Sequence, residues 1–337
     1  MREAGGLRIT GVSAQTGVPG GELAVQCQGF VPGLGSKVLL GDAEAFVLSA
    51  SEDRVRVRLP ENPCCLGLAL RVGGESSPVF PFNLAARLAA ELHPVSNPVV
   101  APDGSIITTV SGTGGQQVEQ PLVRVTRQGD KHPFACEVMN PTGLAFSPDG
   151  QLYVSSRHDG TVLRYTNFEQ MDVVADDLGT PTGLAFDSRG DLFVGDRTGR
   201  IWRLDPAGGK KEEFAALEPS VAAYHLAIDA GDRIYVTGPT FAVRDSLVRV
   251  ARDGKVERLL GGLARPQGMA FLPDGDLLLA TGHKGRMGVF RYCVADGALK
   301  LHVAAPTVVG LAVSGGTAFL ATGDALYSVA LPGHSVN

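Results

Sequence analysis

The sequence predicts an all-β protein of two domains, and three observations support this fold class. A segment of the form Pro-x-Gly-x-Ala-Phe occurs three times, within Pro141–Val154, Pro181–Val194 and Pro266–Leu279. Short runs of alternating apolar and polar residues, separated by turn residues, fill each copy. Residues 1–83 contain similar alternating runs but lack the repeat. Together these observations predict strands throughout, with a change of architecture near residue 83.

The repeat predicts the architecture of residues 84–337. Each copy has one anchor position, which is occupied in chain order by Gly143, Gly183, His225, Gly268 and Gly310. The spacing of these anchors is 40 to 43 residues, and an earlier copy at Asn97–Ile107 brings the count to six. Asp-Gly turns between apolar runs favour hairpins, so each copy contains three or four antiparallel strands. Such a period is typical of the blades of a β-propeller, here with six blades.

The last copy is too short for a complete blade. After its third alternating run, Leu326–Leu331, six residues remain, so an outer strand is missing. We expect Leu84–His93 to supply that strand, with Leu88, Ala90 and Leu92 on one side. A short helix is the alternative, because Ala, Leu, Arg and Glu are good helix formers. We favour the strand because an unclosed ring would expose two sheet edges.

Residues 1–83 predict a small immunoglobulin-like β-sandwich. They hold seven short alternating runs punctuated by Gly and Pro. One of them, Arg54–Arg58, alternates Arg with Val and therefore has one wet and one buried face.

Specific motifs within both regions resemble known families. Gly20–Phe30, Val38–Gly41 and Arg56–Pro60 resemble the IPT/TIG domain, over nearly all of residues 1–83. The repeats of residues 84–337 resemble NHL-type blades and the six-bladed gluconolactonase-like (senescence-marker-protein) superfamily. Together the two regions resemble bacterial proteins that join an IPT/TIG domain to an NHL propeller.

Composition excludes several classes of partner. A net charge of −5 and an isoelectric point near 5.8 give no basic surface for nucleic acid or anionic membrane. No apolar run approaches the ~20 residues of a membrane span, and Met1–Gly6 is not a signal peptide. The residues leave the compartment open between a cytoplasmic protein and an exported one whose leader precedes this sequence.

The residue before each anchor is expected to point into the mouth of the central channel. These mouth positions hold Ser96, Thr142, Thr182, Tyr224, Gln267 and Val309. In gluconolactonase-like enzymes, the resemblance implies Glu, Asn and Asp there as ligands of a divalent cation, and in the related amidating lyases zinc-binding His. Neither set is present, and neutral hydroxyls alone do not offset the dehydration of a hard cation. We therefore predict no metal and no other cofactor.

His225 replaces the anchor glycine in the fourth copy of the repeat, and it follows Tyr224. Because imidazole titrates near neutral pH, His225 and Tyr224 could act as a catalytic acid and base. The alternative is a packed, hydrogen-bonded histidine that fills the space left beside the glycines of the other copies.

The ends of the second strands predict a further polar ring on the same face. Its candidate ligand-binding residues are Arg157, Asp196, Arg197, His283 and Asp324. Arg157 and Arg197 could hold a carboxylate or phosphate, since guanidinium offers paired donors. The alternative is an ion network on the rim, in which Arg157 pairs with Asp196 or Arg197 with Asp324.

The favoured function is therefore binding rather than catalysis. We expect the channel mouth to hold a small polar ligand or a segment of a partner protein. The alternative is a lactone hydrolase or lyase with a rearranged site around His225, Tyr224, Asp196 and His283. A weaker possibility is a zinc site formed by His225, His283 and Asp196.

Overall fold

The computed structural model describes residues 6–33, 35–63, 66–110, 118–134, 138–167, 170–207 and 209–331. All regular elements within these ranges are strands, as predicted. Because no helix occurs among the described residues, none of them lies in a helix long and apolar enough to cross a membrane.

Four consecutive sheets each contain four strands in chain order, joined as antiparallel neighbours. The first holds β11 (Val99–Val100), β12 (Ile106–Thr109), β13 (Leu122–Val125) and β14 (Lys131–Phe134). The second holds β15 (Pro141–Phe146), β16 (Leu152–Ser156), β17 (Thr161–Asn167) and β18 (Gln170–Ala175). The third holds β19 (Pro181–Phe186), β20 (Leu192–Asp196), β21 (Arg200–Asp205) and β22 (Lys210–Ala216). The fourth holds β23 (His225–Ile228), β24 (Ile234–Thr237), β25 (Asp245–Val250) and β26 (Val256–Leu263).

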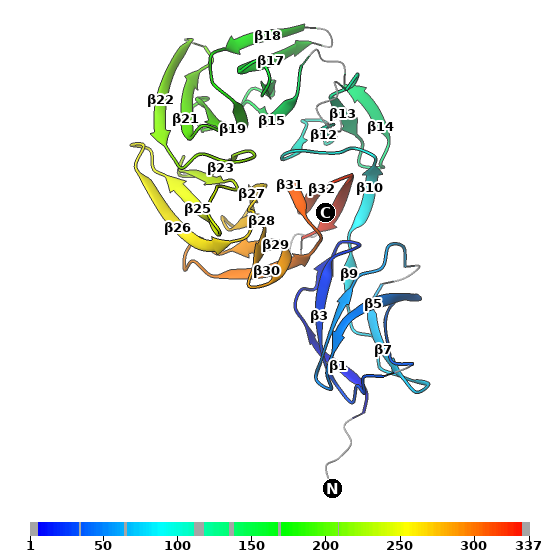
Figure 1. The fold of residues 1–337 in the computed structure, drawn as a ribbon. Coiled ribbons are helices and arrows are strands. Elements are labelled where there is room, and N and C mark those ends of the chain that lie inside the picture. The colour runs from blue at the N-terminus through cyan, green and yellow to red at the C-terminus, as the bar shows by residue number, and fades with distance from the viewer. Residues whose placement is uncertain are drawn as a thin grey trace. The chain divides into compact units, whose positions relative to one another are not determined.

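These sheets stand side by side around a common centre (Figure 1), with β15, β19 and β23 innermost and β18, β22 and β26 outermost. This radial arrangement is that of a β-propeller. The next sheet begins with the same order, in β27 (Met269–Phe271), β28 (Leu277–His283), β29 (Arg286–Tyr292) and β30 (Leu299–Ala304), and continues into β2 (Thr16–Gly17) and β9 (Asn83–Leu84).

The ends of the repeat region pair as the sequence predicted. β10 (Ala86–Ala90) is hydrogen-bonded to β33 (Ala325–Ala330), and β32 (Thr317–Thr322) and β31 (Val308–Ser314) complete that sheet. The strand is therefore confirmed over residues 86–90, and the helix alternative is wrong. β10 covers the edge that β33 would otherwise expose.

The predicted alternation over Leu84–His93 is wrong in detail. Ala89 and Leu92 are the buried residues, whereas Leu88 and Ala90 are half-buried. Glu91 has a φ of 60°, which ends the extended strand and breaks the period of two. Leu92 consequently faces the same apolar cluster as Ala89.

The N-terminal region forms one sheet of seven strands. Its order is β1 (Arg8–Val12), β3 (Glu22–Gln28), β6 (Arg54–Arg58), β5 (Ala43–Ala50), β4 (Lys37–Leu40), β7 (Leu68–Val72) and β8 (Glu75–Ser76). The first half of β5 pairs with β4 and its second half with β6. Strands from both halves contribute to one apolar core that includes Val25, Val38, Val57 and Leu70. The alternating burial of Arg54–Arg58 confirms the predicted wet and buried faces.

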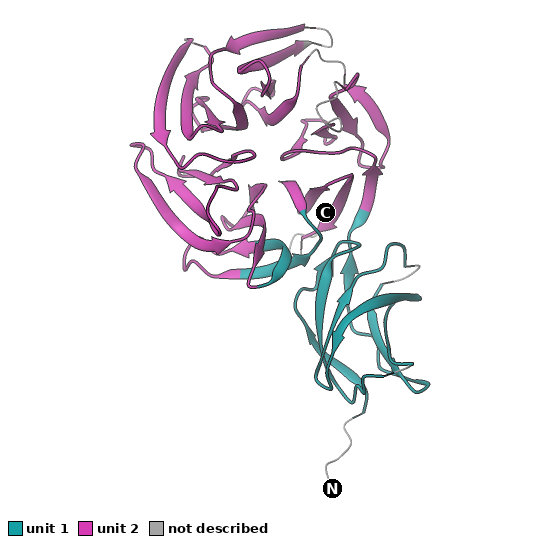
Figure 2. Ribbon diagram, viewed as in Figure 1, with its two compact units in different colours: residues 1–86, 285–290, 300–307 teal, residues 87–284, 291–299, 308–337 magenta. Residues whose placement is uncertain are grey.

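Contacts divide the chain into two units (Figure 2). Unit 1 comprises residues 1–86, 285–290 and 300–307, and unit 2 comprises residues 87–284, 291–299 and 308–337. Within unit 1, β2 pairs in parallel with β9 and β30, and the Val18 amide donates to the Ala304 carbonyl at 2.8 Å. Ala304 belongs to the core of this unit. Unit 1 thus includes short segments from the repeat region, whereas the division into domains 1–83 and 84–337 stays a prediction.

Candidate functional site

The anchor glycines lie where neighbouring copies of the repeat come closest. A Cβ atom added to Gly143 would lie 1.9 Å from the carbonyl oxygen of Thr182, the mouth position of the next copy. The same atom on Gly310 would lie 2.0 Å from the Ser96 carbonyl oxygen. Since ordinary contacts of a Cβ begin near 3.4 Å, a side chain cannot fit there without movement of backbone. The Pro-x-Gly motif therefore reflects the packing of inner strands against one another.

The hydroxyl groups near the mouth are bound to backbone of the neighbouring copy. Ser155 Oγ accepts from the Gly143 amide at 2.7 Å and donates to the Thr182 carbonyl at 2.8 Å. Thr182 Oγ1 accepts from the Tyr224 amide at 3.0 Å and donates to the Gly195 carbonyl at 2.9 Å. These buried side chains hold adjacent sheets together.

The other mouth positions are also enclosed or partly enclosed. Ser96 donates its hydroxyl to the Thr142 carbonyl, and both residues are buried. The Thr142 hydroxyl donates to the Asn140 carbonyl at 3.4 Å. Val309 is half-buried and packs against an apolar cluster. The structure thus gives Ser96 and Thr142 internal partners.

Asn97 is a central residue whose role the sequence did not reveal. Its Nδ2 donates to the Met269 carbonyl at 3.2 Å, and its Oδ1 accepts from the Leu311 amide at 3.1 Å. One amide side chain therefore joins the first copy to the last two. A Cβ atom added to Gly268 would lie 2.1 Å from this Oδ1 atom and 2.5 Å from the backbone Cα atom of Gly310, so both side chain and backbone oppose a larger residue at this anchor.

Tyr224 and His225 have separate partners. The Tyr224 hydroxyl donates to the Glu218 carbonyl, whereas His225 Nε2 lies 3.3 Å from Gln267 Oε1. Burial raises the pKa of Tyr224, and nearby Glu218 and Asp196 raise it further. Burial lowers the pKa of His225 to about 4, although the hydrogen bond to Gln267 opposes this. This geometry fits the alternative of a packed, hydrogen-bonded histidine, because His225 is only 2% exposed.

Asp196 supports the backbone of its own turn. Its carboxylate accepts from the Thr180 amide at 2.9 Å and from the Thr198 amide at 3.1 Å, and the Thr198 hydroxyl also donates to it. The alternative ion network is not formed, because neither Arg157 with Asp196 nor Arg197 with Asp324 makes an ion pair. Arg157 and Arg197 are exposed and form no ion pair with another described residue, and Arg197 Nε instead donates to the Ser220 carbonyl at 3.2 Å.

The remaining polar candidates, Asp324 and His283, take no part in the hydrogen bonds of Asp196 given above. Asp324 is exposed, and its carbonyl accepts from the Leu92 amide at 2.9 Å. His283 ends β28 and is half-buried. Across the ranges that the structure describes, no three His, Cys, Asp or Glu side chains gather into a group that could hold a metal ion. His225, His283 and Asp196, the residues of the alternative zinc site, are therefore not gathered into such a group.

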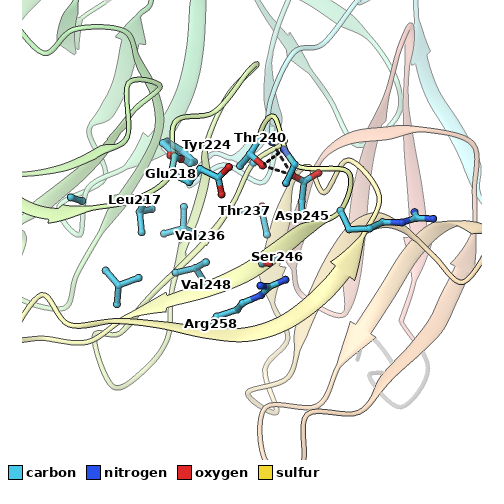
Figure 3. Close-up of a pocket in the computed structure, with 15 residues that line it drawn as sticks. Leu217, Glu218, Tyr224, Val236, Thr237, Thr240, Asp245, Ser246, Val248 and Arg258 are labelled. Atoms are coloured by element: carbon cyan, nitrogen blue, oxygen red, sulfur yellow. Dashed lines mark hydrogen bonds between the residues drawn. The ribbon is translucent and has the colours of Figure 1, made fainter.

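A cavity of about 360 Å³ opens beside Tyr224 (Figure 3). Leu217, Val236 and Val248 form apolar parts of its wall, between the sheets β19–β22 and β23–β26. Polar lining residues complete it: Glu218, Thr237, Thr240, Arg244, Asp245, Ser246 and Arg258. Among the mouth positions, Tyr224 alone lines this cavity.

A second cavity, of about 410 Å³, lies at the hairpin turns that contain Asp149 and Arg189. The arginines of its wall already have carboxylate partners. Arg189 pairs with Asp187 at 3.3 Å, and Arg164 pairs with Asp172 at 3.1 Å. Arg244 and Arg258 of the first cavity form no ion pair with any residue in the described ranges. The first cavity is therefore the better candidate for an external ligand.

The sequence analysis missed most residues of the first cavity. Glu218 lies in the β22–β23 connection, Arg244 in the β24–β25 loop and Arg258 in the outer strand β26. The repeat alignment draws attention to inner strands, where these residues do not occur. One available signal was the long loop Gly238–Arg244, which replaces the short turn Arg197–Gly199 of the preceding copy.

Comparison with known proteins supports the fold. A profile of the family described as "WD domain, G-beta repeat" matches residues 132–165. No curated protein matches the chain. The chain has a β-propeller fold, and solved structures that resemble it align over most of its length.

Three of these structures illustrate the range of functions on the fold. A Bacteroides thetaiotaomicron protein of unknown function has a TM-score of 0.59 at 13% identity, covering 96% of this chain and 98% of its own. An auxiliary nutrient binding protein from Bacteroides ovatus has a TM-score of 0.54 at 12% identity, covering 96% and 97%. A catalytically inactive virginiamycin B lyase from Staphylococcus aureus, with quinupristin, has a TM-score of 0.53 at 14% identity, covering 88% and 99%. At such identities the likeness concerns the fold alone.

Proposed function

We propose that the protein is a non-enzymatic binding protein whose propeller holds a ligand in the cavity beside Tyr224. The observation that carries this proposal is the cavity itself, whose volume of about 360 Å³ is in the range of small-ligand sites. Its wall combines apolar side chains with a few polar groups, which is the usual composition of such sites. The site lies next to the predicted channel mouth and shares Tyr224 with it.

The positions of the candidate catalytic residues also support binding. A hydrolase or lyase would need His225 and Tyr224 to reach one substrate, but His225 is absent from the described lining of the cavity. Its imidazole is 2% exposed and is paired with Gln267. The name of the auxiliary nutrient binding protein that shares the fold is consistent with a binding role, although lyases share the fold as well.

We further propose the finer assignments of the two domains. Counting β27–β30 as a blade, together with the five four-stranded sheets, makes the propeller six-bladed. Residues 1–83 are proposed to be an immunoglobulin-like domain of IPT/TIG type. The motifs at Gly20–Phe30 and Arg56–Pro60 support this assignment, as does the single apolar core enclosed by the seven strands.

A blocking substitution tests the binding site. Ala242→Trp introduces a large side chain at the exposed wall of the cavity without removing a buried group. Ala207→Trp is the matched control, because Ala207 is an exposed residue that lines the second cavity. We expect isothermal titration against a panel of sugars, capped amino acids and short peptides to detect binding by the natural protein and by Ala207→Trp. Ala242→Trp should bind at least tenfold more weakly.

Two results would contradict the proposal. Equal binding by Ala242→Trp and the natural protein would show that the ligand does not bind in this cavity. Turnover of a lactone panel in the presence of calcium, magnesium, manganese or zinc would show that the protein is an enzyme.

A further inference from the structure

We propose that the cavity beside Tyr224 binds a segment of a partner protein that carries an acidic side chain next to apolar ones. This inference rests on the proposed binding function and names its partner class. Three features carry it: a held loop, two exposed apolar side chains on that loop, and two arginines without carboxylate partners in the described part of the chain.

The loop Gly238–Arg244 is held in place by internal hydrogen bonds. Asp245 Oδ1 accepts from the Thr240 amide at 2.8 Å and from the Thr240 hydroxyl at 3.0 Å, as Figure 3 shows. The Thr240 hydroxyl also accepts from the Ala242 amide at 3.0 Å. At the base of the loop, the Pro239 carbonyl accepts from Ser220 Oγ at 2.9 Å and from the Val221 amide at 2.8 Å. The loop is thus organised before any partner binds.

This loop presents apolar side chains to solvent. Phe241 is 86% exposed and Val243 is 95% exposed, although the loop is held. The residues between and beside them, Thr240, Ala242 and Arg244, line the cavity. Phe241 and Val243 therefore contribute little burial to this fold. Their exposed side chains, called the rim below, adjoin the cavity-lining residues in sequence and suit the apolar side chains of a partner.

The charges of the cavity indicate what else the partner carries. Arg244 and Arg258 line it, and neither forms an ion pair with a carboxylate of the described residues. The carboxylate of Asp245 already accepts a hydrogen bond from the Thr240 amide. A carboxylate entering beside these arginines would gain charge-assisted hydrogen bonds from guanidinium groups. Figure 3 shows Glu218 beside Tyr224 and apart from Arg258, so its carboxylate is placed to accept main-chain N–H groups of the same segment.

A peptide segment fits these features better than a small molecule does. A compound enclosed within about 360 Å³ would satisfy the arginines but would leave Phe241 and Val243 in water. An extended chain can insert one acidic side chain and cover the rim with its neighbours. The net charge of −5 makes long-range attraction of acidic peptides unfavourable, so a preference for them must arise from local contacts.

Positional peptide libraries test this inference on the full chain. The probes are fluorescein-labelled hexapeptide pools with a central Asp, Glu, Lys or Gly and one adjacent position fixed as Leu or Ser, measured by fluorescence anisotropy. We expect pools with Asp or Glu beside Leu to bind at least tenfold more tightly than pools with Lys. The double variant Arg244→Ala, Arg258→Ala should lose this acid preference.

The rim is tested separately. Phe241→Ser with Val243→Ser should weaken binding about tenfold, remove the preference for Leu and keep the preference for acid. The matched controls are Val173→Ser, at a valine 61% exposed on β18, and Arg54→Ala, at an exposed arginine on β6. Both controls should bind every pool like the natural protein.

The outcomes separate this inference from the proposed function. If Ala242→Trp blocks capped amino acids or sugars while no peptide pool binds, the binding function stands and the peptide inference is wrong. Peptide binding without acid preference, or unaffected by the rim substitutions, also overturns the inference. If neither small molecules nor peptides bind in an Ala242-dependent manner, both proposals fail.

Discussion

The substitution Gly143→Ala tests the close approach that explains the repeat. Its new Cβ would lie 1.9 Å from the Thr182 carbonyl oxygen and 3.0 Å from both Leu184 Cγ and Ser155 Oγ. To reach an ordinary separation of 3.4 Å, the inner strands must move apart by about 1.5 Å. The obstructing atom is backbone that Ser155 also binds, so relief by a rotamer change is unavailable. We expect a loss of about 4 kcal/mol in the free energy of unfolding, at the upper end of overpacking effects.

Thermal unfolding followed by circular dichroism measures this loss. For a domain of this size, about 4 kcal/mol corresponds to a fall in Tm of roughly 8–16 °C. Gly323→Ala is the control, because nothing lies within 4 Å of its added Cβ. We expect the control to melt within ~2 °C of the natural protein. If Gly143→Ala melts with the control, the packing argument for the anchor glycines is refuted.

Three further substitutions test other parts of the structure. Asn97→Ala should cost about 2–3 kcal/mol in chemical unfolding, because two backbone groups lose their partner; a cost below ~0.5 kcal/mol would exclude a bridging role. In the folded protein the pKa of His225 is about 4, below its usual value near 6.5. Between these two pH values the unfolded chain binds more protons than the folded one. The free energy of unfolding therefore falls as the pH drops from about 6.5 to 4. His225→Gln should reduce this pH-dependent loss by about 3 kcal/mol in unfolding curves at pH 7 and pH 4, and unchanged pH dependence would contradict the assignment. Asp245→Ala should free the β24–β25 loop, seen as faster limited proteolysis there and about tenfold weaker peptide binding, and protection equal to the natural protein would show that Thr240 does not depend on Asp245.

Much of the propeller was predictable because its determinants are local and repeated. Asp-Gly turns and alternating runs specify hairpins within a few residues, and a fixed period repeats them. The closing strand was predictable because a short last copy leaves an edge that another segment must cover. Which face of that strand is buried was not predictable, since the φ of 60° at Glu91 changes the alternation without a clear sequence signal.

The candidate site was less predictable, because its residues come from different copies. The hydroxyl groups of Ser96 and Thr182 look available in sequence, yet backbone groups of the next copy already bind them: the Thr142 carbonyl accepts from Ser96, and the Tyr224 amide donates to Thr182. In contrast, Arg244 and Arg258 have no distinctive motif, and their importance arises from the cavity they share with Tyr224.

The sequence by itself determined the strands, their repeat and the pairing of the two ends of the repeat region, because these depend on local turns and on the count of strands. Tertiary structure decided which polar groups are left for a ligand. A hydroxyl or guanidinium is available only when no neighbouring backbone or carboxylate has bound it. For Ser96 and Ser155 that neighbour is the carbonyl of Thr142 or Thr182 in the next copy, 46 and 27 residues away in the chain. The middle residue of Pro-x-Gly is thus mainly a contact between copies, and the polar groups left for a ligand lie further out, at Arg244 in the β24–β25 loop and Arg258 in the outer strand β26.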